Sequence, residues 1–269
     1  MSNVQWQAQV AAAQAYEDLF VPALFSHWAA VIATAADVTP GKRVLDVACG
    51  TGILSRKLAT LIGSSASIVG LDLTPGMLEV ARRVAPDIEW KQGSAESLPF
   101  ADGSFDAVVS QFGLMFFPDR ARALREMLRV LAPGSRLAVA VWDSLDNIPA
   151  FADELRLMER LAGPAAAAAL RSPFVLGDKD DLQQLAYDAG IGDPAIATHR
   201  ASARFPSIRS LVEADLRGWL PMVGVALDED TIQRVLGEAA IALGAYADSR
   251  GELAFEISAH VLSGARSES

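Results

Sequence analysis

The chain has 269 residues, of which 51% are hydrophobic, and it carries a formal net charge of −10. This length and apolar content suit one large domain with a sizeable core, while the acidic charge disfavours DNA or RNA as a substrate. The single cysteine, Cys49, excludes an intrachain disulfide and a cysteine-based metal site, and the three histidines lack the spacing of metal ligands.

The sequence does not predict a membrane protein. No run reaches the ~20 apolar residues that a spanning helix needs, and the N-terminus lacks the basic and apolar regions of a signal peptide. A single cysteine fits a reducing compartment. We therefore expect a cytoplasmic protein without a membrane span, and its sequence is compatible with a homodimer.

Alanine-rich sequence with aromatic interruptions predicts helices over residues 4–36. Pro22 is expected to start a second helix, because proline is tolerated in a first turn but disrupts a helix interior. Two other residues of this segment are active-site candidates, Tyr16 as a contact on the cofactor side and His27 as a general base.

Residues 44–59 predict a strand, a tight turn and a helix. A short apolar run containing Asp46 precedes Gly50 and Gly52, and helical spacing begins at Ile53. Glycine permits positive φ and a close approach of a ligand, and the helix N-terminus offers unpaired N–H groups. The pattern therefore predicts a binding turn for a nucleotide-like cofactor.

Asp72 lies 20 positions after Gly52, at the end of a second apolar run, where a carboxylate can accept hydrogen bonds from both ribose hydroxyls. Dinucleotides and S-adenosylmethionine share this geometry. The dinucleotide fingerprint requires a third glycine where this chain has Ser55, and Asp46 is a poor neighbour for a pyrophosphate. The pattern favours S-adenosylmethionine, which has a sulfonium and an ammonium group but no phosphate.

Strands alternate with helices along the chain, which predicts an α/β fold with a doubly wound, mostly parallel sheet of seven strands. The first five strands are expected at about 43–48, 67–72, 87–92, 105–111 and 135–142. Further helices are expected over 150–171 and 178–190, a sixth strand over 194–205, and two helices over 207–247. Strict alternation of apolar residues from Leu253 predicts the seventh strand.

Five segments within residues 40–142 together resemble the motifs of class I S-adenosylmethionine-dependent methyltransferases. They are Asp46–Gly52, Gly70–Leu78, Gly93–Phe100, Gly103–Ser110 and Arg125–Gly134. The pattern is similar to that of the group that includes the ubiquinone/menaquinone biosynthesis C-methyltransferases. The resemblance implies a Rossmann-like methyltransferase fold with S-adenosyl-L-methionine as the cofactor.

The resemblance also implies which side chains contact the cofactor. Asp72 would bind the ribose, and Ser110 at the end of the fourth strand would face the methyl group. The remaining contacts run from the methionine end to the adenine: Asp46, Ala48, Gly50, Gly52, Leu73, Met77, Ala95 and Glu96. Many relatives have aspartate where this chain has Ser94, so here the adenine amino group would meet a serine or Glu96 instead.

We expect two domain segments, an N-terminal helical lid at 1–36 and a methyltransferase domain at 37–269. Cap insertions are expected at about 143–176 and 207–247, since a minimal domain of this family joins strands six and seven by a hairpin. The second insertion carries Trp219 and Met222. Together these segments could form a lid that excludes water and supplies the substrate pocket.

Methyl transfer from a sulfonium depends mainly on alignment, and a base is needed only where the nucleophile must lose a proton. His27 and Gln111 are the catalytic candidates, and His260 is more simply explained as a hydrogen-bonded structural residue. The sequence thus predicts methyl transfer to a small organic molecule with an apolar portion, at an unspecified carbon, oxygen or nitrogen. Two alternatives remain open, an NAD-dependent oxidoreductase and a non-catalytic S-adenosylmethionine-binding module.

Overall fold

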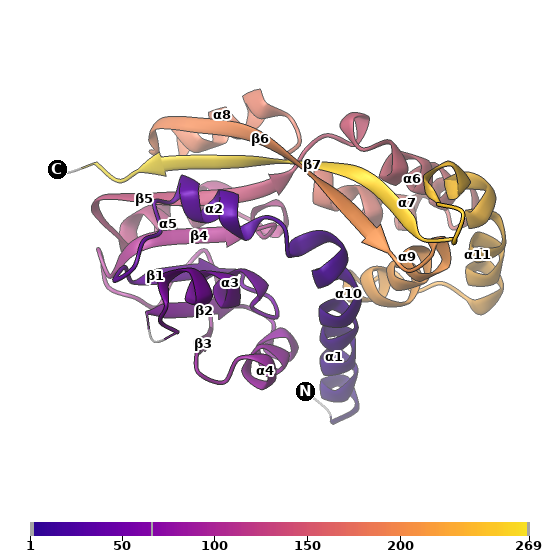
Figure 1. The fold of residues 1–269 in the computed structure, drawn as a ribbon, viewed down its shortest axis with the longest axis horizontal. Helices are drawn as coiled ribbons and strands as arrows, with labels where there is room; N and C mark the ends of the chain where they lie inside the picture. The colour runs from indigo at the N-terminus through magenta and orange to yellow at the C-terminus, as the bar shows by residue number, and fades with distance from the viewer. Residues whose placement is uncertain (1–2, 66, 268–269) are drawn as a thin grey trace.

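The computed structural model describes residues 3–65 and 67–267, and in these residues seven strands form one sheet (Figure 1). The strand order is β3-β2-β1-β4-β5-β7-β6. The strands are β1 (Val44–Val47), β2 (Ile68–Asp72), β3 (Glu89–Gln92), β4 (Phe105–Gln111), β5 (Leu131–Trp142), β6 (Gly192–Phe205) and β7 (Leu253–Ala265). The predicted fold class is confirmed: β1 to β5 pair in parallel, and β7 runs antiparallel to both β5 and β6.

Helices before and between the first five strands complete the doubly wound part of the chain. They are α1 (Asn3–Ala15), the π-helix η1 (Tyr16–Phe25), α2 (Ala29–Ala35), α3 (Ile53–Ile62), α4 (Pro75–Val84), the short 3-10 turn η2 (Leu114–Phe116) and α5 (Arg120–Val130). All four residues of β1 are buried, as expected for a central parallel strand that is covered by helices on both faces.

The remaining helices are η3 (Leu145–Asn147), α6 (Pro149–Leu161), α7 (Pro164–Arg171), η4 (Ser172–Phe174), α8 (Lys179–Asp188), α9 (Ile208–Ala214), the π-helix η5 (Asp215–Trp219), α10 (Leu220–Met222), α11 (Glu229–Leu243) and η6 (Gly244–Tyr246). The sequence predicted one helix over 150–171, but the structure has two. Gly163 has φ of +86° and Pro164 starts α7, so the chain turns between α6 and α7.

A helical cap stands at one end of the sheet. Strands β6 and β7 extend past β5 at this end of the sheet (Figure 1). β6 leads into α9, β7 follows α11, and α6 and α7 follow β5 into the same region. Helices α6 and α11 pack against each other. Helices from 143–176 and from 207–247 therefore lie together in the cap, although α8 and β6 separate these segments in the sequence.

The expectation for Pro22 is wrong, because this residue lies inside η1 rather than at the start of a helix. A π-helix bonds each N–H to the carbonyl five residues earlier, which relaxes the contact between the proline ring and the carbonyl that an α-helix would impose. The π-helix also changes which side chains share a face. Its wider turn carries the face of Tyr16 and Phe20 on to Phe25 instead of to His27.

Helix α1 packs across the first turn of α4. A Cβ built on Gly76 would lie 2.9 Å from the carbonyl carbon of Gln9, so the two helix backbones are in close contact. Residues 1–2 of the expected lid segment lie outside the described residues. Within the described residues, no single helix is long and apolar enough to cross a membrane; Gln5–Phe25 and Ala29–Ala35 pass that test only as a pair, bent by 67°.

Candidate active site

The turn after β1 takes up strained backbone conformations at three of its positions. Ala48, Gly50 and Gly52 have φ of 57°, 57° and 86°. The Gly52 carbonyl then accepts the first hydrogen bond of α3, from the Arg56 N–H at 2.9 Å. Positive φ is costly for alanine, and such strain is concentrated at functional sites, which agrees with the predicted binding turn.

Trp90 of β3 fits against this turn only because two glycines lack side chains. A Cβ on Gly52 would lie 2.2 Å from the indole Cη2, and one on Gly70 would lie 2.3 Å from Cζ3. The sequence interpretation gave Gly52 to the cofactor alone. The structure adds a packing requirement that no spacing rule would have indicated.

Asp46 is fully buried at the end of β1, and Ser55 holds it. One carboxylate oxygen accepts hydrogen bonds from the Ser55 N–H at 3.1 Å and from its hydroxyl at 2.6 Å. Burial raises the pKa of Asp46 to about 7, against the two hydrogen bonds from Ser55, which favour the ionised form. Ser55 replaces the third glycine of the dinucleotide fingerprint, and its hydroxyl instead fixes an acid beside the turn.

We expect Ser55→Ala to destabilise the protein more at high pH than at low pH. The Ser55 hydroxyl stabilises the ionised form of Asp46, whose pKa in the native protein lies above its unfolded value. The stability lost with that hydroxyl should therefore grow as the pH rises through about 7 and Asp46 ionises. Losing a hydrogen bond to a charged group costs about 1.5–3 kcal/mol, so urea unfolding should show about that difference at pH 8.5. At pH 5.5, where Asp46 is protonated in the native state, the difference should fall to about 1 kcal/mol.

Thr60→Ala is the matched control. It also removes a hydroxyl from α3, but this hydroxyl donates to the Arg56 carbonyl and not to a carboxylate. Its effect should not change with pH. An equal loss of stability for Ser55→Ala at both pH values would contradict the assignment of the Asp46 charge state.

Asp72 is the second buried acid, at the end of the neighbouring strand β2. One of its oxygens accepts the Gly50 N–H at 2.9 Å, and the other accepts the Thr74 N–H at 2.8 Å. Burial raises the pKa of Asp72, while the backbone N–H groups of Thr74 and Gly50 act in the opposite direction. The carboxylate is therefore held between the glycine turn and the start of α4, as a ribose contact requires.

Four buried oxygens near the carboxyl end of the sheet lack any hydrogen-bond partner in the described residues: Asp46 Oδ1, Thr51 Oγ1, Ser110 Oγ and Gln111 Oε1. A carboxylate and hydroxyls accept hydrogen bonds from an ammonium group. Ser110 and Ala48 meet at Gly113, where an added Cβ would lie 3.1 Å from Ser110 Oγ and 2.6 Å from Ala48 Cβ. These unpaired acceptors suit the ammonium group at the methionine end of S-adenosylmethionine, and the unpaired carboxylate of Asp46 is a poor neighbour for a pyrophosphate.

The residues expected near the adenine differ in their availability. Leu73 is 66% exposed and free to cover a ring, whereas Met77 is buried against Ala13 of α1. Ala95 is buried as well. One carboxylate oxygen of Glu96 accepts the Asp119 N–H at 2.6 Å, so this side chain is already engaged with the start of α5.

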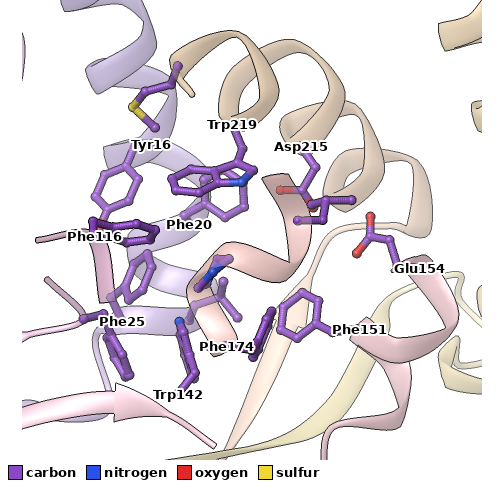
Figure 2. A pocket seen from close by; sticks show the side chains of 15 residues that line it. Tyr16, Phe20, Phe25, Phe116, Trp142, Phe151, Glu154, Phe174, Asp215 and Trp219 are labelled. Carbon is purple, nitrogen blue, oxygen red and sulfur yellow. The ribbon is translucent and has the colours of Figure 1, made fainter. Parts of the chain in front are cut away.

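An aromatic cavity of about 140 Å³ lies between the sheet and the cap (Figure 2). Its walls come from η1, from the ends of β4 and β5, and from both cap insertions. The lining residues are Tyr16, Phe20, Leu24, Phe25, Phe112, Phe116, Trp142, Phe151, Glu154, Leu170, Pro173, Phe174, Asp215, Trp219 and Met222. Phe116 is 44% exposed and faces Trp219, with ring centroids 5.3 Å apart.

Tyr16 joins this cavity to the glycine turn. A Cβ on Gly50 would lie 3.9 Å from Tyr16 Cε1, and the same ring lines the cavity. Burial raises the pKa of Tyr16 far above its usual value, with the charge of Asp72 as the next cause, so the phenol stays protonated. Gln111 donates to the Phe25 carbonyl at 3.2 Å and thereby ties η1 to the end of β4.

The structure does not bring His27 to the cavity. The residue is exposed in the turn after η1 and is not among the lining residues, because the π-helix directs its aromatic face elsewhere. His260 is buried in β7, with Nδ1 3.0 Å from the Thr198 hydroxyl and Nε2 3.1 Å from the Gly177 carbonyl. It is thus a hydrogen-bonded structural histidine.

Two acids at the far end of the cavity, Glu154 and Asp215, were missed by the sequence interpretation. Glu154 lies on the buried face of α6, between Ala150 and Met158, and Asp215 follows Leu211 by one helical turn. An acid at an apolar position of an amphipathic helix was the signal that could have revealed both residues.

Known proteins are similar to this chain in sequence and in structure. The sequence profile of the methyltransferase domain family matches residues 45–139. The chain is 35% identical over 213 residues to a demethylmenaquinone methyltransferase of Paenarthrobacter aurescens, covering 71% of this chain and 81% of that relative. It is 41% identical over 136 residues to the ubiquinone/menaquinone biosynthesis C-methyltransferase UbiE of Ectopseudomonas mendocina, covering 48% of this chain and 53% of that relative.

The chain spans about half the length of most curated relatives that it matches most strongly, 46% to 55% in three examples. The crystal structure of the YcgJ protein from Bacillus subtilis has a TM-score of 0.59 and 21% identity, covering 90% of this chain and 99% of that one, and supports the fold. Fold, site and comparisons together define a class I methyltransferase. The chain belongs to the S-adenosylmethionine-dependent methyltransferases, in the group that includes the ubiquinone/menaquinone C-methyltransferases, and S-adenosylmethionine is its cofactor.

Proposed function

We propose that this protein transfers the methyl group of S-adenosylmethionine to an apolar small molecule bound in the aromatic cavity. The observation that carries the proposal is the position of Tyr16, whose ring contacts the glycine turn on one side and lines the cavity on the other. The cofactor turn and the cavity are therefore adjacent, as a direct transfer between two bound molecules requires.

The cofactor, when bound, supplies an electrophilic methyl group on a sulfonium. Asp46 and Ser110 would orient its methionine end, and Asp72 its ribose. Gly50 and Gly52 would allow the backbone to approach closely, and Leu73, Met77, Ala95 and Glu96 would surround the adenine. Tyr16 would contact the cofactor from the side of the cavity, leaving the methyl group open to the acceptor. Gln111 would act as a positioning residue, since its amide fixes η1.

Alignment in a dry cavity is the main contribution that these residues make to the rate. Holding two reactants in a reactive geometry can lower a barrier by about 7–11 kcal/mol, so no general base is required for the bulk of the effect. Phe112 and Trp142, stacked with ring centroids 3.9 Å apart at the sheet edge, would form the wall against which an acceptor lies.

Residues 1–36, 143–176 and 207–247 would form the lid, because side chains from all three segments line the cavity. The names of the two relatives described above refer to quinones. A flat apolar ring of that kind suits these aromatic walls. The cavity is complete within one chain, so a homodimer would leave it unchanged. With its single buried Cys49, the protein would work in the cytoplasm.

Transfer of a radioactive methyl group tests this proposal. The protein is incubated with methyl-labelled S-adenosylmethionine and a solvent extract of bacterial small molecules, and label should enter the apolar fraction. Trp219→Ala should reduce the transfer about tenfold or more by opening the cavity, with unchanged cofactor affinity. Label that stays on the cofactor under all these conditions would contradict catalysis and favour a non-catalytic binding module.

A further inference from the structure

The methyl transfer proposed above uses neither of the two acids at the end of the cavity, Glu154 and Asp215. Glu154 is 1% exposed and Asp215 is 6% exposed, and both line the cavity. Neither carboxylate oxygen of Glu154 meets a hydrogen-bond donor in the described part of the chain. Figure 2 shows the pair at the opposite end of the cavity from Tyr16.

The cations of the surrounding helices do not reach the acid pair: Arg171 at the end of α7 is exposed and is not a lining residue, and the others are paired elsewhere. On α6, Arg160 pairs with Glu238 of α11 at 2.6 Å, and Arg156 pairs with Asp153. Within η5, Arg217 pairs with Glu229 at 2.7 Å. Asp153 also accepts the Tyr246 hydroxyl at 2.7 Å. Among the lining residues, Tyr16 is the only other titratable group, so the acid pair has no cation of its own.

Burial raises the pKa of both acids, and for Glu154 the neighbouring charge of Asp215 raises it further. Two neighbouring buried carboxyl groups cannot both ionise without an opposite charge, so at least one of them holds a proton. Burial of unpaired acids costs stability, and apolar residues would fill the same space at a lower cost. The pair is therefore best explained by a ligand that enters the cavity.

The walls beside the acids indicate what charge that ligand carries. Phe151 and Phe174 lie close together, with ring centroids 5.5 Å apart, and Trp219 forms the opposite side (Figure 2). The Trp219 N–H is already used by the Ala169 carbonyl at 3.1 Å, so the indole presents its ring rather than a donor. Aromatic faces and carboxylates both attract cations, and both lack donors for an anion.

We propose that Glu154 and Asp215 anchor the ammonium group of an amine-bearing methyl acceptor. The inference rests on the proposed function, because it takes the same cavity as the acceptor site. The ammonium would lie between the two carboxylates at the cap end, and the apolar body of the molecule would extend between the aromatic walls toward Tyr16. On binding, a proton leaves the acid pair for solvent, and the ammonium group of the amine provides the positive charge that replaces it.

Calorimetry with three small probes of similar shape tests the anchor directly. These are 2-phenylethylamine, the neutral 2-phenylethanol and the anionic 3-phenylpropionate, each titrated into the full-length protein saturated with S-adenosylhomocysteine. The amine should bind about tenfold or more tightly than the alcohol, and the carboxylate should not bind. Titrations at pH 6 in two buffers of different ionisation enthalpy should show a proton released with the amine and none with the alcohol.

Variants of the pair should remove this preference without affecting the cofactor. Glu154→Gln and Asp215→Asn should each weaken binding of the amine about tenfold, abolish proton release and leave the alcohol within about twofold. Glu159→Gln, which removes an exposed acid from the same helix, should change none of these values. Equal affinity for amine and alcohol, or proton release that persists in both variants, would overturn the anchor. If the unaltered protein does not bind S-adenosylhomocysteine at all, the proposed function itself is refuted.

Discussion

Asp72→Ala is expected to reduce the affinity for S-adenosylmethionine at least about 100-fold, because two charge-assisted hydrogen bonds to the ribose, worth about 1.5–3 kcal/mol each, would be lost. The same change frees the N–H groups of Gly50 and Thr74, which the carboxylate accepts in the structure. The glycine turn would therefore lose both its ligand contact and an internal tie. Calorimetry with S-adenosylhomocysteine measures the effect, and label transfer should fall in parallel.

Asp87→Asn provides the control. Asp87 is an exposed acid after α4, and its substitution removes the same charge from the same half of the sheet. Its affinity for the cofactor should stay within about twofold of the unaltered protein, as screened surface charges contribute little. Asp72→Asn should fall between the two, because an amide can still accept a hydrogen bond from one hydroxyl. Cofactor binding that survives Asp72→Ala would place the adenosine elsewhere.

Gly52→Ala should cause the second large effect, a loss of stability of about 2–5 kcal/mol from overpacking and backbone strain together. Gly52 has φ of +86°, and an added Cβ would lie 2.2 Å from the Trp90 ring, so a rigid indole or the turn itself must shift. For a chain of this size, 1 kcal/mol corresponds to about 2–4 °C, and the midpoint of thermal unfolding should therefore fall by roughly 4–20 °C.

Gly63→Ala separates the two contributions. Gly63 ends the same helix, α3, with φ of +71°, and nothing lies within 4 Å of its built Cβ. Its substitution should cost only the left-handed backbone strain, about 1–2 kcal/mol. Trp90→Leu combined with Gly52→Ala should recover part of the loss by relieving the contact. Equal effects at the two glycines would show that packing against Trp90 is unimportant.

The central part of the fold was predictable because local signals and tertiary structure agree there. The turn at Gly50 and Gly52, and the acids Asp46 and Asp72, follow from strand–turn–helix patterning that the parallel sheet preserves. The strand boundaries differed by a few residues, and β5 begins at Leu131, before the expected turn at Pro133.

The N-terminal segment was less predictable because its helix type decides which residues face the cavity. An α-helical reading places His27 near Tyr16, but η1 is a π-helix and places His27 in solvent. No rule of spacing or propensity selects a π-helix, which is rare and is stabilised here by tertiary contacts such as the Gln111 bond to Phe25.

The cavity itself could not be derived from the sequence, since it exists only where three distant segments meet. Trp142 and Trp219 were individually credible as wall residues, but the acids Glu154 and Asp215 gain meaning only from their shared position. Long-range proximity of this kind has no local signature. The sequence thus indicated the turn and the acids that we expect to bind the cofactor, but not the cavity that we propose for the acceptor.

A comparison of two cofactors tests the central claim most directly, namely that the strand-end acids bind an adenosyl sulfonium and not a phosphorylated dinucleotide. S-adenosylmethionine and NAD⁺ are titrated separately into the protein by calorimetry, with Asp72→Ala as the reference. The account predicts one-site binding of S-adenosylmethionine that Asp72→Ala abolishes, and no heat from NAD⁺. Tight binding of NAD⁺, with none of S-adenosylmethionine, would contradict it.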